Sequence, residues 1–109
     1  MPSFLRNEVV LVSYPFTDFS AMKIRPAIVI HAPHSSVDLV LVPLSSQIAG
    51  LTDGEFVLND WAAAGLKMPS AIKRRIATIH PSLVIRKIGS LTPVDAVHLD
   101  ASLRFWLGL

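Results

Sequence analysis

Two short segments of the chain carry side chains that are suited to phosphate chemistry. Arg25 stands directly before an apolar run, and a second apolar run ends in three polar residues: Ser45, Ser46 and Gln47. Strand ends from one sheet can converge in space, and arginine offers a planar fork of donors that stays charged. The two segments together could therefore cradle a phosphate group. An exposed loop arginine and an ordinary turn are the other interpretation of the same residues.

Basic side chains are concentrated in the second half of the sequence. Residues 61–94 contain no acid, and they hold six of the ten lysines and arginines: Lys67, Lys73, Arg74, Arg75, Arg86 and Lys87. This asymmetry suits an anionic partner such as nucleic acid, although a solvated basic face has the same pattern. On a strand, Lys73 and Arg75 would share a face and could follow an RNA phosphate backbone.

The elements that must position these groups are mostly strands. Alternating and β-branched residues predict strands over residues 8–14, 26–31, 37–44, 55–58, 71–80 and 84–90. Residues 15–23 are predicted to be a loop, and Asn59 and Asp60 could cap a single helical turn that Gly65 ends. The chain is therefore predicted to be mainly β, with a small, curled antiparallel sheet or barrel.

The clearest helix lies at the C-terminal end of the chain. Thr92 precedes Pro93 at the first helical position, and Asp95 follows the threonine by three residues, which is the pattern of a capping box. The apolar residues of this helix form two faces, which are Val94, Val97, Ala101 and Phe105, and Leu99, Leu103, Trp106 and Leu107. A helix that is apolar on two sides needs two surfaces to cover it. We expect its own sheet to cover one face, and a second subunit or a partner peptide to cover the other.

Length and composition limit the class of protein. The chain has 109 residues, of which 51% are hydrophobic and 17% charged, so residues 1–109 are predicted to form one domain with surplus apolar surface for an interface. It has no cysteine, which excludes disulfides and thiolate chemistry. The N-terminus does not read as a signal peptide, and no apolar run has membrane-spanning length. We therefore expect a cytoplasmic protein without membrane association. The four histidines are scattered and predict no metal site.

Six motifs occur in an order that resembles a known family. They are residues 9–18, 25–29, 43–47, 65–70, 76–79 and 88–92, followed by the terminal helix. In this order the chain resembles the MazF/PemK family of toxin ribonucleases from type II toxin–antitoxin pairs. The resemblance implies an SH3-like barrel of the CcdB/Kid/MazF type with a C-terminal helix, usually a homodimer. It also implies a growth-inhibiting, sequence-selective endoribonuclease that cleaves single-stranded mRNA without metal or cofactor and is silenced by a cognate antitoxin.

Metal-free RNA cleavage uses the 2′-OH of the substrate as its nucleophile, so the protein needs no nucleophile of its own. It must help to remove the proton of this hydroxyl, stabilise the phosphorane and protonate the departing 5′ oxygen. The resemblance implies that Arg25 stabilises the developing charge, and that Ser45 holds the phosphate where the family usually has threonine. Residues expected to bind RNA are Thr17, Asp18, Lys23, Ser46, Gln47, Lys73 and Arg75.

The general base is not assigned by the sequence. Some members of the family carry an acid before the late strand, but this region here reads Met68, Pro69 and Ser70. Three other residues are candidates for the base: Glu8, Asp18 and His31.

Two other functions remain open at this point. The CcdB-like branch of the same fold poisons DNA gyrase with residues near its C-terminus, and this chain ends in an apolar segment, residues 105–109. A non-catalytic barrel that binds RNA or a peptide is the third possibility, because the late-strand acid is missing.

Overall fold

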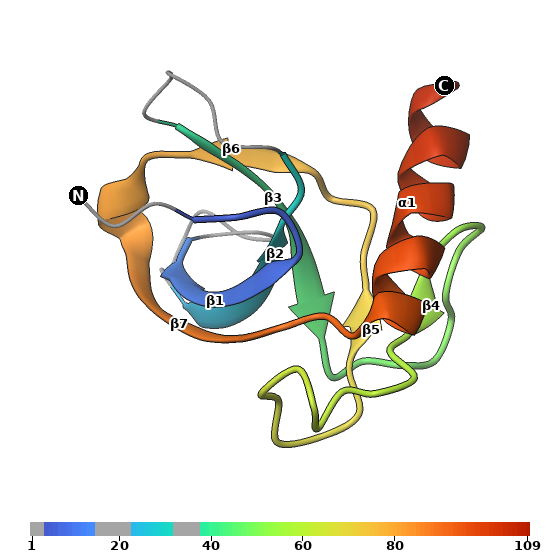
Figure 1. Ribbon diagram of the computed structural model, residues 1–109, viewed down its shortest axis with the longest axis horizontal. Coiled ribbons are helices and arrows are strands. Elements are labelled where there is room, and N and C mark those ends of the chain that lie inside the picture. The colour runs from blue at the N-terminus through green and yellow to red at the C-terminus, as the bar shows by residue number, and fades with distance from the viewer. Residues whose placement is uncertain (1–3, 15–22, 32–37) are drawn as a thin grey trace.

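Antiparallel strands and one C-terminal helix make up the computed structural model, which describes residues 4–14, 23–31 and 38–109 (Figure 1). The elements in chain order are β1 (Glu8–Ser13), β2 (Ile24–Val29), β3 (Leu39–Ser45), β4 (Phe56–Val57), β5 (Ala71–Ile72), β6 (Ala77–Ile79), a 3-10 turn η1 (Pro81–Leu83), β7 (Val84–Ser90) and α1 (Pro93–Leu107). The predicted mainly β architecture with a terminal helix is confirmed.

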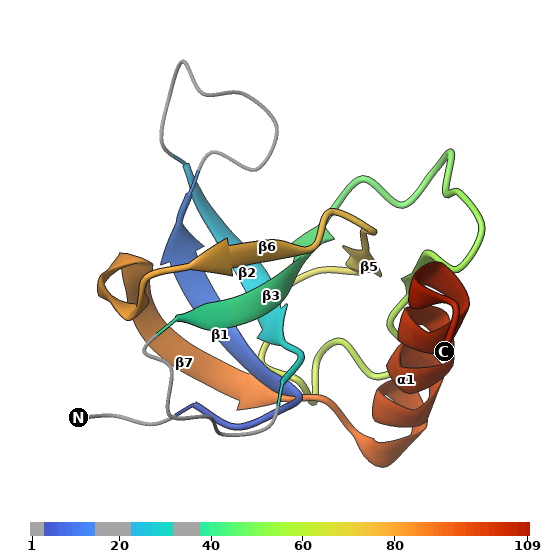
Figure 2. The ribbon, with the colours of Figure 1, turned by 90° about the horizontal axis from the view of Figure 1, so that it is seen from above.

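The strands form a single curled sheet. Its order is β4-β5-β3-β2-β1-β7, and β6 also pairs with β3. Every pairing is antiparallel. Figure 2 shows how β1, β2, β3 and β6 cross one another as the sheet curls, with η1 leading from β6 into β7. The sheet is not closed, because no pairing among the described residues joins β7 to β4 or β6.

The strand predicted over residues 71–80 is wrong, because two short strands take its place. β5 pairs with the end of β3 through Leu44 and Ile72, and β6 pairs with its beginning through Leu41 and Ala77. Residues 73–76 form a bulge between them, in which the N–H of Ile76 donates to the carbonyl of Arg74 at 2.7 Å. Lys73 and Arg75 therefore do not share the face of one strand. Alternation in the sequence cannot reveal such extra residues, because they depend on the register against β3.

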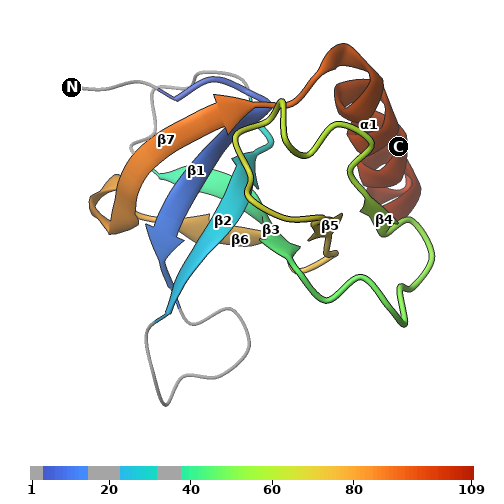
Figure 3. The same ribbon diagram turned by 90° about the horizontal axis from the view of Figure 1, so that it is seen from below.

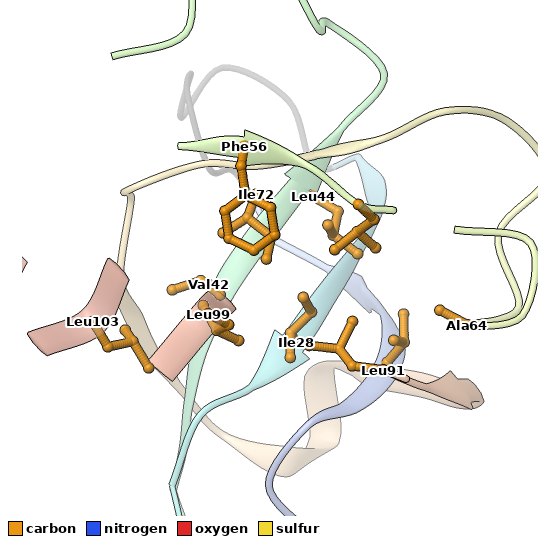
Figure 4. Packing of buried hydrophobic residues seen from close by; sticks show 11 residues of the cluster. Ile28, Val42, Leu44, Phe56, Ala64, Ile72, Leu91, Leu99 and Leu103 are labelled. Carbon is orange, nitrogen blue, oxygen red and sulfur yellow. The ribbon is translucent and has the colours of Figure 1, made fainter. Parts of the chain in front are cut away.

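Both faces of the sheet are buried along β1 and β3, which explains why these strands read as nearly continuous apolar runs. On one face, residues from β2, β3 and β5 meet Leu99 and Leu103 of the helix, together with Phe56 and Leu91 (Figure 4). On the other face, Val10, Val12, Ala27, Val29, Leu39, Leu41 and Ile79 fill the inside of the curl. The two clusters fix the relative positions of the strand ends.

The start of α1 differs from the predicted capping box. Thr92 is the N-cap residue, but its hydroxyl donates to the carboxylate of Asp60 at 3.0 Å instead of capping the helix. The carboxylate of Asp95 accepts from the backbone N–H groups of Asn59 at 2.8 Å and Asp60 at 2.9 Å. The predicted helical turn after Asp60 forms as a hydrogen-bonded turn and not as a regular helix: the N–H of Ala64 donates to the carbonyl of Asp60 at 3.2 Å.

The two apolar faces of α1 meet different surroundings. Leu99 and Leu103 are buried against the sheet, whereas Val94, Val97 and Phe105 are 62%, 71% and 64% exposed. Leu107, which the sequence pattern groups with Leu99 and Leu103, is also exposed. One face of the helix is thus uncovered within this chain. No helix in the described part is both long and apolar enough to cross a membrane.

Candidate functional site

Arg25 lies within β2 rather than before it, because the strand begins at Ile24. It pairs with Val12 of β1, and the ladder extends further through the N–H of Tyr14, which donates to the carbonyl of Lys23 at 3.2 Å. Residues two apart on a strand point to the same side, so Arg25 and Lys23 share a face. Both side chains are exposed. The guanidinium makes one long hydrogen bond, 3.4 Å to the carbonyl of Ile24.

Ser45 ends β3, where it pairs with Ala71. Its hydroxyl oxygen accepts from the N–H of Gln47 at 3.0 Å, which shapes the turn that follows the strand. Because the oxygen acts as acceptor in this bond, the O–H remains available to donate to a ligand. Ser46 and Gln47 are exposed on the same turn.

Arg25 and Ser45 stand at the same end of neighbouring strands. The last paired residues of β2 and β3 at this end are Ala27 and Pro43, and each candidate lies two residues beyond that pair. Figures 2 and 3 show that the two strands cross at an angle, with β2 starting on the side of the sheet away from α1 and β3 ending beside β5. A guanidinium and a hydroxyl thus lie at the same end of two neighbouring strands, and these are groups that can donate to a phosphate.

The bulge at residues 73–76 adds further positive charge near the end of β3. The N–H of Lys73 donates to the carbonyl of Pro43 at 3.0 Å, so its backbone lies beside β3 on the side opposite to β2. Arg75 is exposed two residues further along. Arg74, which the alternation had assigned to the other face, is also exposed here, and no local sequence signal could have shown its position.

The three candidates for the general base do not all lie near Arg25. Glu8 is at the opposite end of β1, where it pairs with Ser90, and Val12 is the residue opposite Arg25. The rise of a strand places these two ends ~13 Å apart. His31 follows the other end of β2, six residues beyond Arg25. Asp18, like the predicted RNA contact Thr17, lies outside the described residues.

Glu8 instead has the contacts of a residue that stabilises the fold. Its side chain is buried, and its carboxylate accepts from the N–H of Leu5 at 2.7 Å and from Nζ of Lys87 at 2.6 Å. Burial by itself would raise the pKa of Glu8, but the hydrogen bonds from Lys87 and Leu5 outweigh it and hold the pKa below its ordinary value. The residue therefore fixes the entry into β1.

No metal centre is formed by the part of the chain that the structure describes. Groups of three or more histidine, aspartate and glutamate side chains do not come together there. The chemistry that the site can offer is that of an exposed cation together with hydroxyl and amide donors at the ends of two neighbouring strands.

Comparison with known families identifies the chain. A profile of the PemK-like, MazF-like toxins of type II toxin–antitoxin systems matches residues 5–107. The chain belongs to this toxin family. The family predicted from the order of sequence motifs is thereby confirmed, and the CcdB-like interpretation is not favoured. No curated protein matches the chain in sequence.

Solved structures share the fold of this toxin at low sequence identity. A mycobacterial endoribonuclease in complex with its cognate antitoxin superposes with a TM-score of 0.75 at 17% identity, covering 98% of this chain and 97% of that chain. The Mycobacterium tuberculosis toxin MazF-mt6 gives 0.76 at 19% identity, with 94% and 97% covered. A mycobacterial endoribonuclease gives 0.74 at 15% identity, with 100% and 95% covered. At these identities the likeness shows the MazF-type fold.

Proposed function

We propose that this toxin is a metal-independent endoribonuclease that cleaves single-stranded mRNA and is neutralised by an antitoxin. The observation that carries the proposal is the placement of Arg25 and Ser45 at the same end of β2 and β3. Membership of the toxin family and the likeness to structures of endoribonucleases support it. The cytoplasmic location expected from the sequence agrees with mRNA as the substrate.

In the proposed reaction the 2′ oxygen of the substrate attacks the adjacent phosphorus. The bond from phosphorus to the 5′ oxygen breaks, and the products are a 2′,3′-cyclic phosphate and a free 5′-hydroxyl. Arg25 stabilises the negative charge of the phosphorane, and the hydroxyl of Ser45 donates to a phosphate oxygen. Lys23, on the same face as Arg25, attracts the phosphate backbone. Asp18 lies outside the described residues, so its role as the general base stays a prediction.

The remaining predicted contacts fall into two groups. Ser46 and Gln47 extend the donor set beyond Ser45 and are proposed to contact the RNA. Lys73 and Arg75 are proposed to attract phosphates from the bulge, although they do so from irregular backbone and not from one strand face.

A homodimer is proposed on the part of the uncovered α1 face that Val94, Val97 and Ala101 form, which leaves Phe105 outside the interface. Val94 and Val97 on this face are largely exposed, and Ala101 continues the stripe along the helix. Apolar stripes of this kind are typical of helix interfaces.

The test is incubation of the purified protein with end-labelled single-stranded RNA in excess EDTA. Discrete fragments with 5′-hydroxyl ends are expected from the wild type and not from Arg25→Ala. Arg86→Ala is the matched control, because Arg86 is an exposed arginine on β7, outside the proposed site. Intact RNA across varied sequences would contradict the enzymatic proposal. If the protein then still bound RNA, it would support the non-catalytic alternative.

A further inference from the structure

An open cavity of about 550 Å³ lies beside the last turn of α1. Its lining comes from three separate segments and consists of Thr52, Asp53, Arg74, Phe105 and Trp106. Figures 1 and 3 both show the loop from β3 to β4 passing beside the C-terminal half of the helix. None of these residues has a role in the proposed reaction.

The loop and the bulge are joined by one carboxylate. Glu55 accepts from the N–H of Thr52 at 2.8 Å and from the N–H of Arg74 at 2.9 Å. Burial would raise the pKa of Glu55, but these backbone hydrogen bonds outweigh it and lower the pKa, so the Glu55 carboxylate is charged at neutral pH. Two walls of the cavity are thus held in place before any ligand binds.

The helix is joined to the same loop by three contacts. The indole N–H of Trp106 donates to the carbonyl of Asp53 at 2.8 Å, and the hydroxyl of Ser102 donates to the carbonyl of Gly54 at 2.7 Å. A side chain on Gly54 would overlap the indole of Trp106, so the ring lies directly against the glycine backbone. The cavity is therefore preorganised on all three sides, which lowers the entropic cost of binding.

The lining combines the groups that recognise an unpaired nucleotide. The ring of Phe105 is 64% exposed and offers a stacking face, and Arg74 offers an exposed cation for a phosphate. Thr52 and Asp53 add a hydroxyl and a carboxylate, and a carboxylate can accept from the amino group of a base. The stacking face, the base acceptor and the cation thus match the ring, the amino group and the phosphate of a single nucleotide.

The position of the cavity connects it to the proposed cleavage site. Arg74 directly follows Lys73, whose N–H is bonded to Pro43 in the last pair of β2 and β3. Thr52 lies seven residues after Ser45, on the loop that leaves the cleavage edge. We propose that this cavity is a base-binding subsite, which holds an unpaired nucleotide of the RNA strand that extends from the cleavage site. This inference rests on the proposed ribonuclease function.

The first experiment measures binding of fluorescent single-stranded RNA to the full chain carrying Arg25→Ala, so that the RNA stays intact. Adding Phe105→Ala or Arg74→Ala is expected to weaken binding about tenfold, the scale of one lost stacking or charge contact. Leu107→Ala and Arg86→Ala are the matched controls, since both residues are exposed and lie outside the cavity. Their affinity should stay within about twofold of the parent. Unchanged thermal unfolding and sedimentation would show that neither folding nor assembly causes the loss.

The second experiment asks whether the cavity reads the base. In the active protein, Asp53→Asn replaces an acceptor by an amide, and it is expected to change which sequences are cut when the fragments are sequenced. If the wild type cuts RNA and Arg25→Ala does not, the proposed function stands. If the cavity variants then keep the same affinity and the same cut sites, the subsite is overturned. A wild type that neither binds nor cuts RNA would overturn both. The subsite is also overturned if the cavity variants bind RNA as before but no longer bind a synthetic Leu-Glu repeat peptide. That result would assign the cavity to a polypeptide.

Discussion

The backbones of Gly65 and Gly89 lie in direct contact. A β-carbon on Gly89 would overlap the carbonyl of Ala64, and one on Gly65 would overlap the carbonyl of Ile88. The turn that contains Gly65 therefore lies against the end of β7, the last strand of the sheet order. Covering an edge strand in this way protects it from pairing with another chain.

Gly89→Ala is expected to destabilise the protein by about 1–3 kcal/mol, because backbone must move to make room for the methyl group. The measurement is the free energy of unfolding in urea. Ser90→Ala is the control, since Ser90 is the exposed neighbour on the same strand. Equal stabilities of the two variants would show that the glycine contact is not required.

Asp95→Ala is expected to cost about 2–4 kcal/mol, because it removes a buried carboxylate that accepts two backbone N–H groups and leaves both unsatisfied. Asp95→Asn keeps one acceptor and should cost less. Asp100→Asn is the surface comparison, since its partners Arg6 and Arg104 are exposed and such ion pairs contribute about 0–1 kcal/mol. Urea denaturation of the three variants measures this order. If Asp95→Ala cost as little as Asp100→Asn, the hydrogen bonds from Asn59 and Asp60 to Asp95 would not be stabilising the fold.

The stabilisation by Glu8 is expected to depend on pH. Its pKa is lower in the folded protein than the ordinary value of 4.5, so folding favours the charged form. The stabilisation is then fully present above pH 4.5 and is lost as the pH falls through the folded pKa. The difference in unfolding free energy between wild type and Glu8→Gln should be largest near neutral pH and shrink in acid. A difference that does not vary with pH would mean that the charge of Glu8 is not involved.

Ser45→Ala is expected to lower the cleavage rate by ~10²–10³, because it removes a donor to the phosphate. Ser45→Thr keeps the hydroxyl and should retain most of the activity. The rate is measured with labelled RNA at saturating protein. A Ser45→Ala variant with full activity would restrict the role of this residue to shaping the turn at Gln47.

Val97→Asp is expected to convert a dimer into a monomer, because it places a charge in the middle of the uncovered helix face. Sedimentation velocity measures the change in mass. The control is Ile85→Asp on β7, an exposed apolar residue far from this stripe in the sequence. A wild type that sediments as a monomer would contradict the proposed dimer.

Local sequence patterns were enough to predict much of the fold. The apolar runs of β1 and β3 were predicted because these strands are buried on both faces and leave little room for polar residues, whereas β7, which has no buried residue, was predicted from its alternation. The helix start at Thr92 and Pro93 was predicted because capping preferences depend on neighbouring residues alone. The order of the motifs along the chain was enough to show the resemblance to the toxin family, and the family profile matches residues 5–107.

Contacts between residues that are far apart in the chain could be found only from the tertiary structure. Whether Glu8 lies near Arg25 depends on which end of β1 meets β2, and the carboxylate of Asp95 found its partners 35 and 36 residues away. The bulge at residues 73–76 and the cavity between Arg74 and Trp106 arise from register and from packing of the helix on the loop. Such contacts join segments that are far apart in the chain, so neither periodicity nor spacing records them. Local patterns therefore predicted most strands, the helix and the family, whereas long-range packing divided the strand predicted over residues 71–80 and set which side chains meet.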